Sequence, residues 1–163
     1  MRTCIKILLL LIISISVNAQ QGYPDSLKHA LKNASTDSAR YSISSTLVSY
    51  YIEENRDSAL YYIEEALLLA KKNNKQLDEA SSFDVKGYIL MHLGKLPESY
   101  QCFPTALKIA ENPENENKTW HRVTILTPHK LRLTVLANLH HDFGHLMGAI
   151  GKTDQQRVPR TDA

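Results

Sequence analysis

Two histidines near the end of the chain have a spacing that suits zinc chemistry. The motif His141-Asp142-x-x-His145 places two imidazoles four positions apart, on one face of a helix. A catalytic zinc also requires a third protein ligand and an activated water, and His121 and His129 are near in sequence but are expected on a loop. A zinc-dependent hydrolase using His141 and His145 is therefore the least favoured function. We expect no catalytic residue, no metal and no cofactor.

The composition is that of an ordinary globular chain. The 163 residues allow one domain or two, and 43% are hydrophobic and 22% charged. Arg2 and Lys6 account for two of the 19 basic residues, so the rest of the chain has 17 basic and 17 acidic residues. A nucleic-acid-binding protein requires a basic surface that neutralises phosphates. We therefore expect no nucleic-acid partner.

The first nineteen residues have the pattern of a secretory signal peptide. Arg2 and Lys6 precede an apolar run over residues 7–17, and small residues surround a cleavage point after Ala19. An eleven-residue run is short for a membrane helix, which takes about twenty residues, although an uncleaved anchor is the alternative. We expect an exported chain that starts near Gln20, with no stable membrane span after cleavage. Its one remaining cysteine, Cys102, excludes an intramolecular disulfide.

Apolar residues after residue 20 recur at helical spacing, and no stretch shows a sustained period of two. The expected helices cover residues 25–33, 37–54, 57–72, 76–93 and 97–110, followed by a last helix from Pro128 to Gly151. Asp37 and Asp57 are the expected N-caps of the second and third helices. Residues 20–35 then form a leading helix and linker, 36–156 the main domain with a polar loop over 111–127, and 157–163 a disordered tail.

Two pairs of segments repeat within the chain. Residues 57–70 align with 97–110 at an offset of 40, which pairs Ala59 with Ser99 and Ala66 with Ala106. Residues 83–94 align with 140–151 at an offset of 57, and the 17 additional residues match the length of the polar loop. Self-similarity at such periods is typical of helical repeat proteins.

These positions resemble the tetratricopeptide repeat (TPR), a helix–turn–helix unit. Its small position in the first helix corresponds to Gly87 and Gly144, and its turn glycine to Gly94 and Gly151. The resemblance implies an all-α fold of about two and a half hairpins in a short right-handed solenoid. One departure is Pro104, which lies inside an expected helix and removes one backbone hydrogen bond.

The recurring Asp-Ser pairs and the forty-residue spacing are similar to those of one particular group of TPR regions. They resemble exported TPR sensor regions of histidine kinases and transcription regulators in Gram-negative bacteria. This resemblance implies a periplasmic or secreted, non-enzymatic module that binds a peptide or protein in signal transduction. The chain contains no kinase motif, so we expect a sensor region alone or a fragment of one. The alternative is an independent exported adaptor or assembly factor.

In TPR domains the first helix of each unit lines a concave groove. Carried over by position, this groove consists of Tyr41, Ser44, Val48, Tyr51, Ile52, Ser81, Asp84, Tyr88, Met91, His92, Asn138, His141, His145, Gly148 and Ala149. We expect half of them to be exposed, and the expected peptide contacts are Tyr51, Asp84, Tyr88, His92, His141 and His145. Aromatic rings and polar groups of this kind suit an extended peptide.

The last helix carries an apolar stripe that no later helix in the chain is expected to cover. The stripe consists of Leu136, Leu139, Phe143, Met147 and Ile150. Repeat proteins gain stability from neighbouring units and need a cap at each end. We therefore expect part of the stripe to pack back on the second unit and a patch of it to remain open. The chain should then either self-associate through this helix or be marginally stable alone. Trp120, in the polar loop, is expected to anchor that loop on the helices.

Overall fold

The structure, a computed structural model, describes residues 22–120 and 126–157, with side chains up to residue 151. A helix over residues 22–33 comes first. It is followed by α2 (Asp37–Glu54), α3 (Arg56–Lys72), α4 (Gln76–His92), α5 (Leu96–Glu111), the 3-10 helix η1 (Pro113–Asn115) and α6 (Pro128–Arg157). The described residues include no strand, which confirms the all-α prediction. The expected signal peptide and most of the expected tail lie outside these residues.

The N-caps of α2 and α3 differ from those expected. The hydroxyl of Thr36 accepts a hydrogen bond from the Ala39 N–H at 3.1 Å, and the Asn55 side chain accepts one from Ser58 N–H at 3.0 Å. Both caps have extended backbone angles, as a cap requires, whereas Asp37 and Asp57 already lie in the first helical turn. There the two carboxylates still interact favourably with the positive end of the helix dipole.

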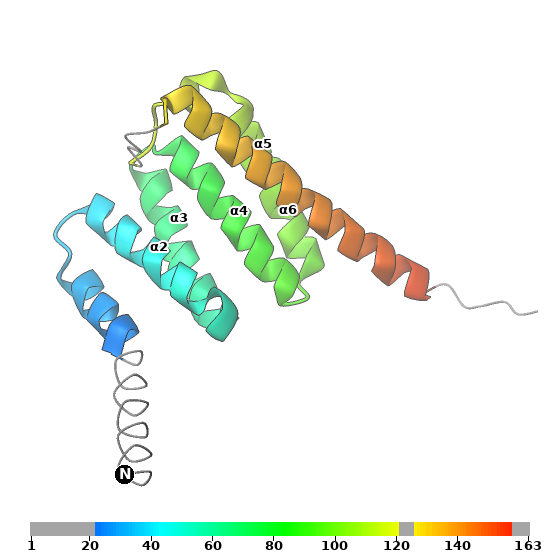
Figure 1. Cartoon of the computed structure of the whole chain (residues 1–163), viewed down its shortest axis with the longest axis horizontal. Helices are drawn as coiled ribbons and strands as arrows, with labels where there is room; N and C mark the ends of the chain where they lie inside the picture. Colours follow the sequence, from blue (N-terminus) through cyan, green and yellow to red (C-terminus); the bar gives the residue numbers. More distant parts are fainter. Residues whose placement is uncertain (1–21, 121–125, 158–163) are drawn as a thin grey trace, which may run out of the picture.

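The helices pack as hairpins arranged in a row, with α4 shared between two hydrophobic cores (Figure 1). The first core joins α2, α3 and α4 and consists of Tyr41, Val48, Ala59, Ile63, Ala66, Leu69, Ala70 and Ile89. The second joins α4, α5 and α6 and consists of Leu77, Ala80, Phe103, Ala106, Ala110, Val135, Leu139 and Leu146. The repeat-related pairs Ala59 and Ser99, and Ala66 and Ala106, are all fully buried, so each small residue allows close helix packing.

The turn between α4 and α5 uses a glycine where the backbone requires one. Gly94 has a φ of +74°, in the left-handed region that favours glycine. The following helix runs without interruption from Leu96 to Glu111, and Pro104 lies on its exposed side. The lost backbone hydrogen bond at Pro104 therefore does not end α5.

The last helix is longer than expected. It continues past Gly151 to Arg157 as part of a 30-residue helix, and it extends beyond the other helices in Figure 1. Gly151 is not among the residues with positive φ, so it does not form the turn that Gly94 forms. A glycine ends a helix only when the chain adopts the left-handed conformation there, and the sequence pattern alone does not require it.

Most of the apolar stripe of α6 packs against the second core. Leu139 is fully buried, and Leu136, Phe143 and Ile150 are half-buried against α4 and α5. Met147 is the member of the stripe that remains largely exposed, at 48%. Part of the stripe therefore packs back on the second unit and part of it stays exposed, because α4 and α5 together offer a surface wide enough to cover most of it.

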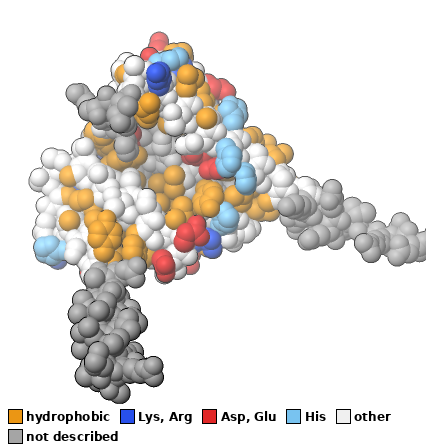
Figure 2. Space-filling model, in the orientation of Figure 1, with side chains coloured by type: hydrophobic (Ala, Val, Ile, Leu, Met, Phe, Trp, Pro, Cys, Tyr) orange, Lys and Arg blue, Asp and Glu red, His pale blue; other side chains and the backbone are white. Residues whose placement is uncertain are grey.

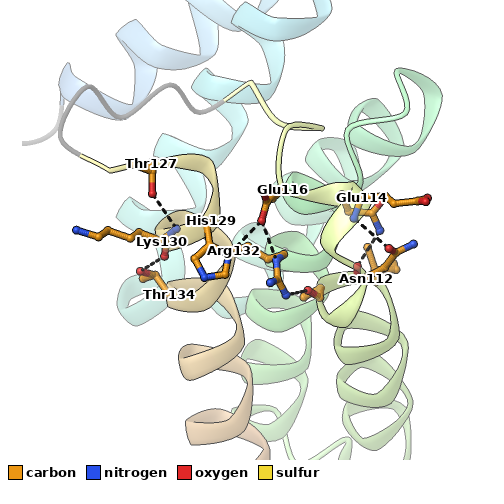
Figure 3. A network of polar contacts seen from close by, with 11 residues as sticks. Asn112, Glu114, Glu116, Thr127, His129, Lys130, Arg132 and Thr134 are labelled. Atoms are coloured by element: carbon orange, nitrogen blue, oxygen red, sulfur yellow. Dashed lines mark hydrogen bonds and ion pairs between the residues drawn. The ribbon is translucent and has the colours of Figure 1, made fainter.

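A buried arginine joins the start of α6 to the end of α5. Arg132 is 8% exposed, and its Nη1 donates a hydrogen bond to the Ala110 carbonyl at 3.2 Å. Its Nε lies 3.3 Å from Glu116 Oε2, which also contacts His129 (Figure 3). A cation at the end of α5 suits the negative end of the helix dipole. This network holds the segment after α5 against the first turns of α6.

The polar loop is docked on the helices by Trp120, as expected. Asp78, which is buried in the first turn of α4, accepts hydrogen bonds from the Thr119 hydroxyl and the Trp120 N–H, both at 2.6 Å. The Trp120 ring packs on Tyr41 of α2, with the ring centroids 5.1 Å apart. The described part of the loop therefore closes one end of the α2–α4 interface.

Residues 22–120 and 126–157 contain no helix with the length and apolarity that crossing a membrane requires.

Candidate functional site

A cavity lies between α2 and α4, the first helices of the two hairpins. It has a volume of about 340 Å³, and Figure 2 shows apolar side chains gathered around the hollowed centre of this face. Its lining residues are Tyr41, Ser45, Val48, Ser49 and Ile52 of α2, Ile63 of α3, and Ser81, Ser82 and Val85 of α4. We call this cavity the α2–α4 groove. Apolar walls with serine hydroxyls among them offer both apolar contact and hydrogen bonds.

The sequence predicted some of the residues that line this groove. Tyr41, Val48, Ile52 and Ser81 were expected there, whereas Ser45, Ser49, Ser82 and Val85 were not. Of the fifteen positions carried over from the resemblance, Tyr41, Ser44, Val48 and Asp84 are buried. His92, Asn138, His141, His145 and Gly148 are exposed. Fewer than half are thus exposed, because the first-unit positions pack between the helices.

Tyr51 does not join the other candidate contacts. It is half-buried near the end of α2, where its ring stacks on Tyr62 of α3 with an interplanar angle of 11°. The Lys28 ammonium, from the helix over residues 22–33, lies 5.7 Å from its ring centroid. Tyr51 therefore belongs to an aromatic cluster that links three helices.

The other five candidate contacts lie on α4 and α6. The Tyr88 and His92 rings are 4.3 Å apart on α4, and the His141 and His145 rings are 4.5 Å apart on α6. Histidine side chains gather over α6 in Figure 2, with carboxylates beside them. The fifth residue, Asp84, is buried in α4. We call these five residues together with Asp142 the α4–α6 polar cluster.

Asp84 carries the strongest electrostatic perturbation in this cluster. Burial, the largest cause, and the negative charge of Asp142 raise the pKa of its carboxyl group from 3.8 to about 7, against a lowering effect of His141. Among the described residues, Asp84 Oδ1 has no hydrogen-bond partner. The carboxyl group is therefore poised between its neutral and ionised forms near neutral pH.

The donor set does not fit a zinc site. The part of the chain that the structure describes has no group of three or more His, Cys, Asp or Glu side chains placed to hold a metal ion. The Nδ1 atom of His141 contacts Asp142 Oδ1 at 3.0 Å. A catalytic zinc needs three protein ligands, so His141 and His145 lack the third within these residues.

The stacked helical hairpins, with a groove between their first helices, define a TPR-type repeat protein. The sequence model of the SusR N-terminal TPR domain matches residues 17–117, more than half of the chain, and the chain therefore belongs to this TPR family. The match covers α2 to α5 and ends before α6, so His141 and His145 lie outside it. Comparisons with curated proteins and with solved structures gave no match.

Proposed function

We propose that the chain is a non-enzymatic module that binds an extended peptide or protein segment in the α2–α4 groove. The observation that carries this proposal is the groove itself, an open cavity between the first helices of two successive hairpins. TPR domains in general bind proteins or peptides, which agrees with this location.

The lining of the groove indicates the character of the bound segment. Val48, Ile52 and Val85 supply apolar contact, and the hydroxyls of Ser45, Ser49 and Ser81 lie among them. An extended peptide presents side chains and backbone N–H and C=O groups together, so it needs both kinds of surface. The three hydroxyls donate to carbonyl groups of their own helices, so their oxygens remain able to accept. We propose that a small apolar side chain of the ligand enters the groove while its backbone N–H groups donate hydrogen bonds to the serine oxygens.

A binding measurement with paired variants tests this function. The wild-type chain is applied to an array of random peptides, and the dissociation constants of the bound peptides are then measured for Val85→Arg and Leu68→Arg. Val85 lines the groove, whereas Leu68 is 68% exposed on α3 and does not. We expect Val85→Arg to weaken binding at least tenfold and Leu68→Arg to leave it unchanged. Equal binding by all three proteins would rule out the groove.

We also propose that the module works outside the cytoplasm, as the sensing region of a signal-transduction protein. The signal-peptide pattern of residues 1–19 supports export to the periplasm or beyond. The match to a domain described as N-terminal supports a place at the start of a larger protein. An independent exported adaptor or assembly factor is the alternative. Mass spectrometry of the protein recovered from cells tests export, with Gln20 as the expected first residue and an intact Met1 form as the contrary result.

We further propose that α6 pairs with a second copy of the chain. Leu133 and Met147 are 47% and 48% exposed on α6, and a Cβ added at Gly144 would meet nothing within 4 Å. In the repeat-related position Gly87, the same added Cβ would contact Phe103 of the partner helix α5. The face of α6 equivalent to the covered face of α4 is therefore open, and exposed apolar side chains on it favour association.

A further inference from the structure

A second cavity lies where the helix over residues 22–33, drawn in blue in Figure 1, meets α2 and α3. It has a volume of about 460 Å³ and is open to solvent, as pockets for small ligands are. Its lining residues are Lys28, Leu31 and Lys32 of the first helix, Arg40 of α2, and Tyr61, Tyr62 and Glu65 of α3. We call this cavity the basic pocket. It shares no lining residue with the α2–α4 groove, so the two sites are separate.

The helix over residues 22–33 packs beside α2 and runs in the opposite direction. Near its start, the Tyr23 ring lies 6.2 Å from the ring of Tyr50, which is near the end of α2. At its other end, Lys32 lines the basic pocket together with Arg40 from the start of α2. This packing therefore brings cations from two helices into one cavity.

The lining of the basic pocket has an excess of positive charge. Three of its side chains are cationic and one is anionic, so its formal net charge is +2. Glu65 accepts a hydrogen bond from Arg40 Nη2 at 2.8 Å, which occupies one of the five N–H donors of the guanidinium group. Lys32 is exposed and makes no ion pair with any other described residue. The pocket therefore keeps cationic donors that can bind an anion.

The third cation, Lys28, is only weakly occupied by its neighbours. Its ammonium group lies 3.1 Å from Asp25 Oδ1 and 5.7 Å from the centroid of the Tyr51 ring. The Asp25 side chain is 76% exposed, and an exposed ion pair of this kind contributes little free energy. An incoming anion can therefore replace Asp25 at small cost.

The rings and the leucine of the basic pocket indicate that the anion belongs to an organic molecule. Tyr61 is 65% exposed on α3, so its ring can contact a ligand. Leu31 and the half-buried Tyr62 complete the apolar part of the lining. An inorganic ion would use the cations alone, whereas an apolar body attached to the anion would also cover these side chains.

We propose that the basic pocket binds a small organic oxyanion. Its carboxylate or phosphate group contacts Lys32 and Arg40, and its aromatic or apolar body contacts Tyr61. Oxygens of both groups accept charge-assisted hydrogen bonds from ammonium and guanidinium groups. Glu65 repels a second anionic group, so a ligand with one such group is favoured over a polyanion. This site is independent of the peptide binding proposed above.

The first part of the test compares four small probes. Nuclear magnetic resonance spectra of the isotopically labelled chain are recorded during separate titrations with phenyl phosphate, phenylacetate, inorganic phosphate and benzyl alcohol. We expect saturable shifts at Lys32, Arg40 and Tyr61 with at least one of the two organic anions, and the tighter of them identifies the anionic group. Benzyl alcohol should cause no such shifts. Inorganic phosphate should bind about tenfold more weakly than phenyl phosphate, because it does not cover the ring.

The second part measures the dissociation constant of the tighter organic anion for three variants. Arg40→Gln and Lys32→Gln each remove one cation and should weaken binding about tenfold. Lys108→Gln removes an exposed lysine of α5 outside the pocket and should leave binding unchanged. Because Lys32 has no ion-pair partner among the described residues, Lys32→Gln should keep the thermal stability of wild type, which separates lost binding from unfolding. Added salt should weaken binding by the wild-type chain.

The outcomes bear on this pocket alone. The absence of a saturable shift with either organic anion overturns the proposal. Benzyl alcohol binding as tightly as the anions, or equal affinities of wild type, Lys32→Gln and Arg40→Gln, also overturns it. Inorganic phosphate binding as tightly as phenyl phosphate overturns the part assigned to the organic body. Peptide binding in the α2–α4 groove stands or falls by its own test, since no residue is common to the two sites.

Discussion

Gly87 of α4 lies against the ring of Phe103 of α5 so closely that a Cβ on Gly87 would be 2.8 Å from the ring atoms Cε2 and Cζ. The Ser99 hydroxyl donates a hydrogen bond to the Gly87 carbonyl at 2.7 Å, which fixes the two helices at this distance. This contact determines how α4 packs on α5, and α4 is the helix that carries one wall of the α2–α4 groove.

We predict that Gly87→Ala destabilises the chain and that Gly144→Ala does not. The added methyl group at Gly87 displaces a fully buried ring, which costs about 1–3 kcal/mol. At Gly144 the added methyl group meets nothing within 4 Å, and alanine favours the helix over glycine by about 0.5–1 kcal/mol. Urea unfolding of both variants followed by circular dichroism checks the prediction. Equal effects at the two positions would contradict it.

A second prediction concerns the contact between Asp78 and Trp120. Asp78→Ala leaves the Trp120 N–H and the Thr119 hydroxyl without this acceptor, at a cost of about 1–3 kcal/mol. Trp120 is the only tryptophan in the chain, so its fluorescence reports on loop docking alone. We expect a red-shifted emission with helix content retained. Asp25→Ala, at an exposed position, should leave the emission unchanged, and an unshifted spectrum for Asp78→Ala would show that the loop docks by other contacts.

The third prediction is a pH dependence that originates at Asp84. Burial raises the pKa of this carboxyl group from 3.8 to about 7, so the folded state holds the proton to a higher pH than the unfolded state does. The free energy of unfolding should therefore fall as the pH rises from about 4 through about 7. Asp84→Asn removes this titration, so its stability relative to wild type should rise over the same interval and level off above about pH 8. Thermal unfolding at a series of pH values measures the difference, and a constant difference would contradict the prediction.

The fourth prediction separates the two faces of α6. Phe143 stacks on Phe103 of α5 at 5.6 Å between ring centroids, so Phe143→Asp should destabilise the fold by about 2 kcal/mol or more. Leu133 and Met147 are exposed, so changing both to aspartate should raise the monomer fraction and leave thermal stability near that of wild type. Sedimentation velocity over a range of concentrations measures the monomer fraction. A wild-type chain that remains monomeric at high concentration would disprove the association.

The helix pairs could be predicted from the sequence because their signals are local and repeated. Ala59, Ala66, Ser99 and Ala106 recur at one offset, and all four are buried where two helices meet. The N-caps of α2 and α3 lie one or two residues before the expected ones, because several polar residues near each helix start are suitable caps. Thr36 and Asn55 adopt the extended backbone that a cap needs, and nothing in the local sequence distinguishes them from Asp37 and Asp57.

The candidate site was predicted less well than the fold, because it depends on how each helix is rotated against its neighbours. Ser45, Ser49 and Val85 line the groove, whereas Tyr51, a position carried over from the resemblance, turns toward α3. The histidines of α6 were placed correctly on one exposed face because their spacing alone defines it. The pairing of Asp84 with α6 depends on the position of a helix far along the chain, and no sequence spacing encodes it.

The measurement that tests the central claim most directly is the mapping of a bound peptide by nuclear magnetic resonance. A peptide selected by the wild-type chain is added to the labelled protein, and the shifts of all backbone amides are compared before and after. The α2–α4 groove predicts the largest shifts at Ser45, Ser49 and Val85, with little change at Tyr61 and Leu68, which are 65% and 68% exposed on α3. Shifts confined to α3, with none at the groove residues, would contradict the proposed binding site.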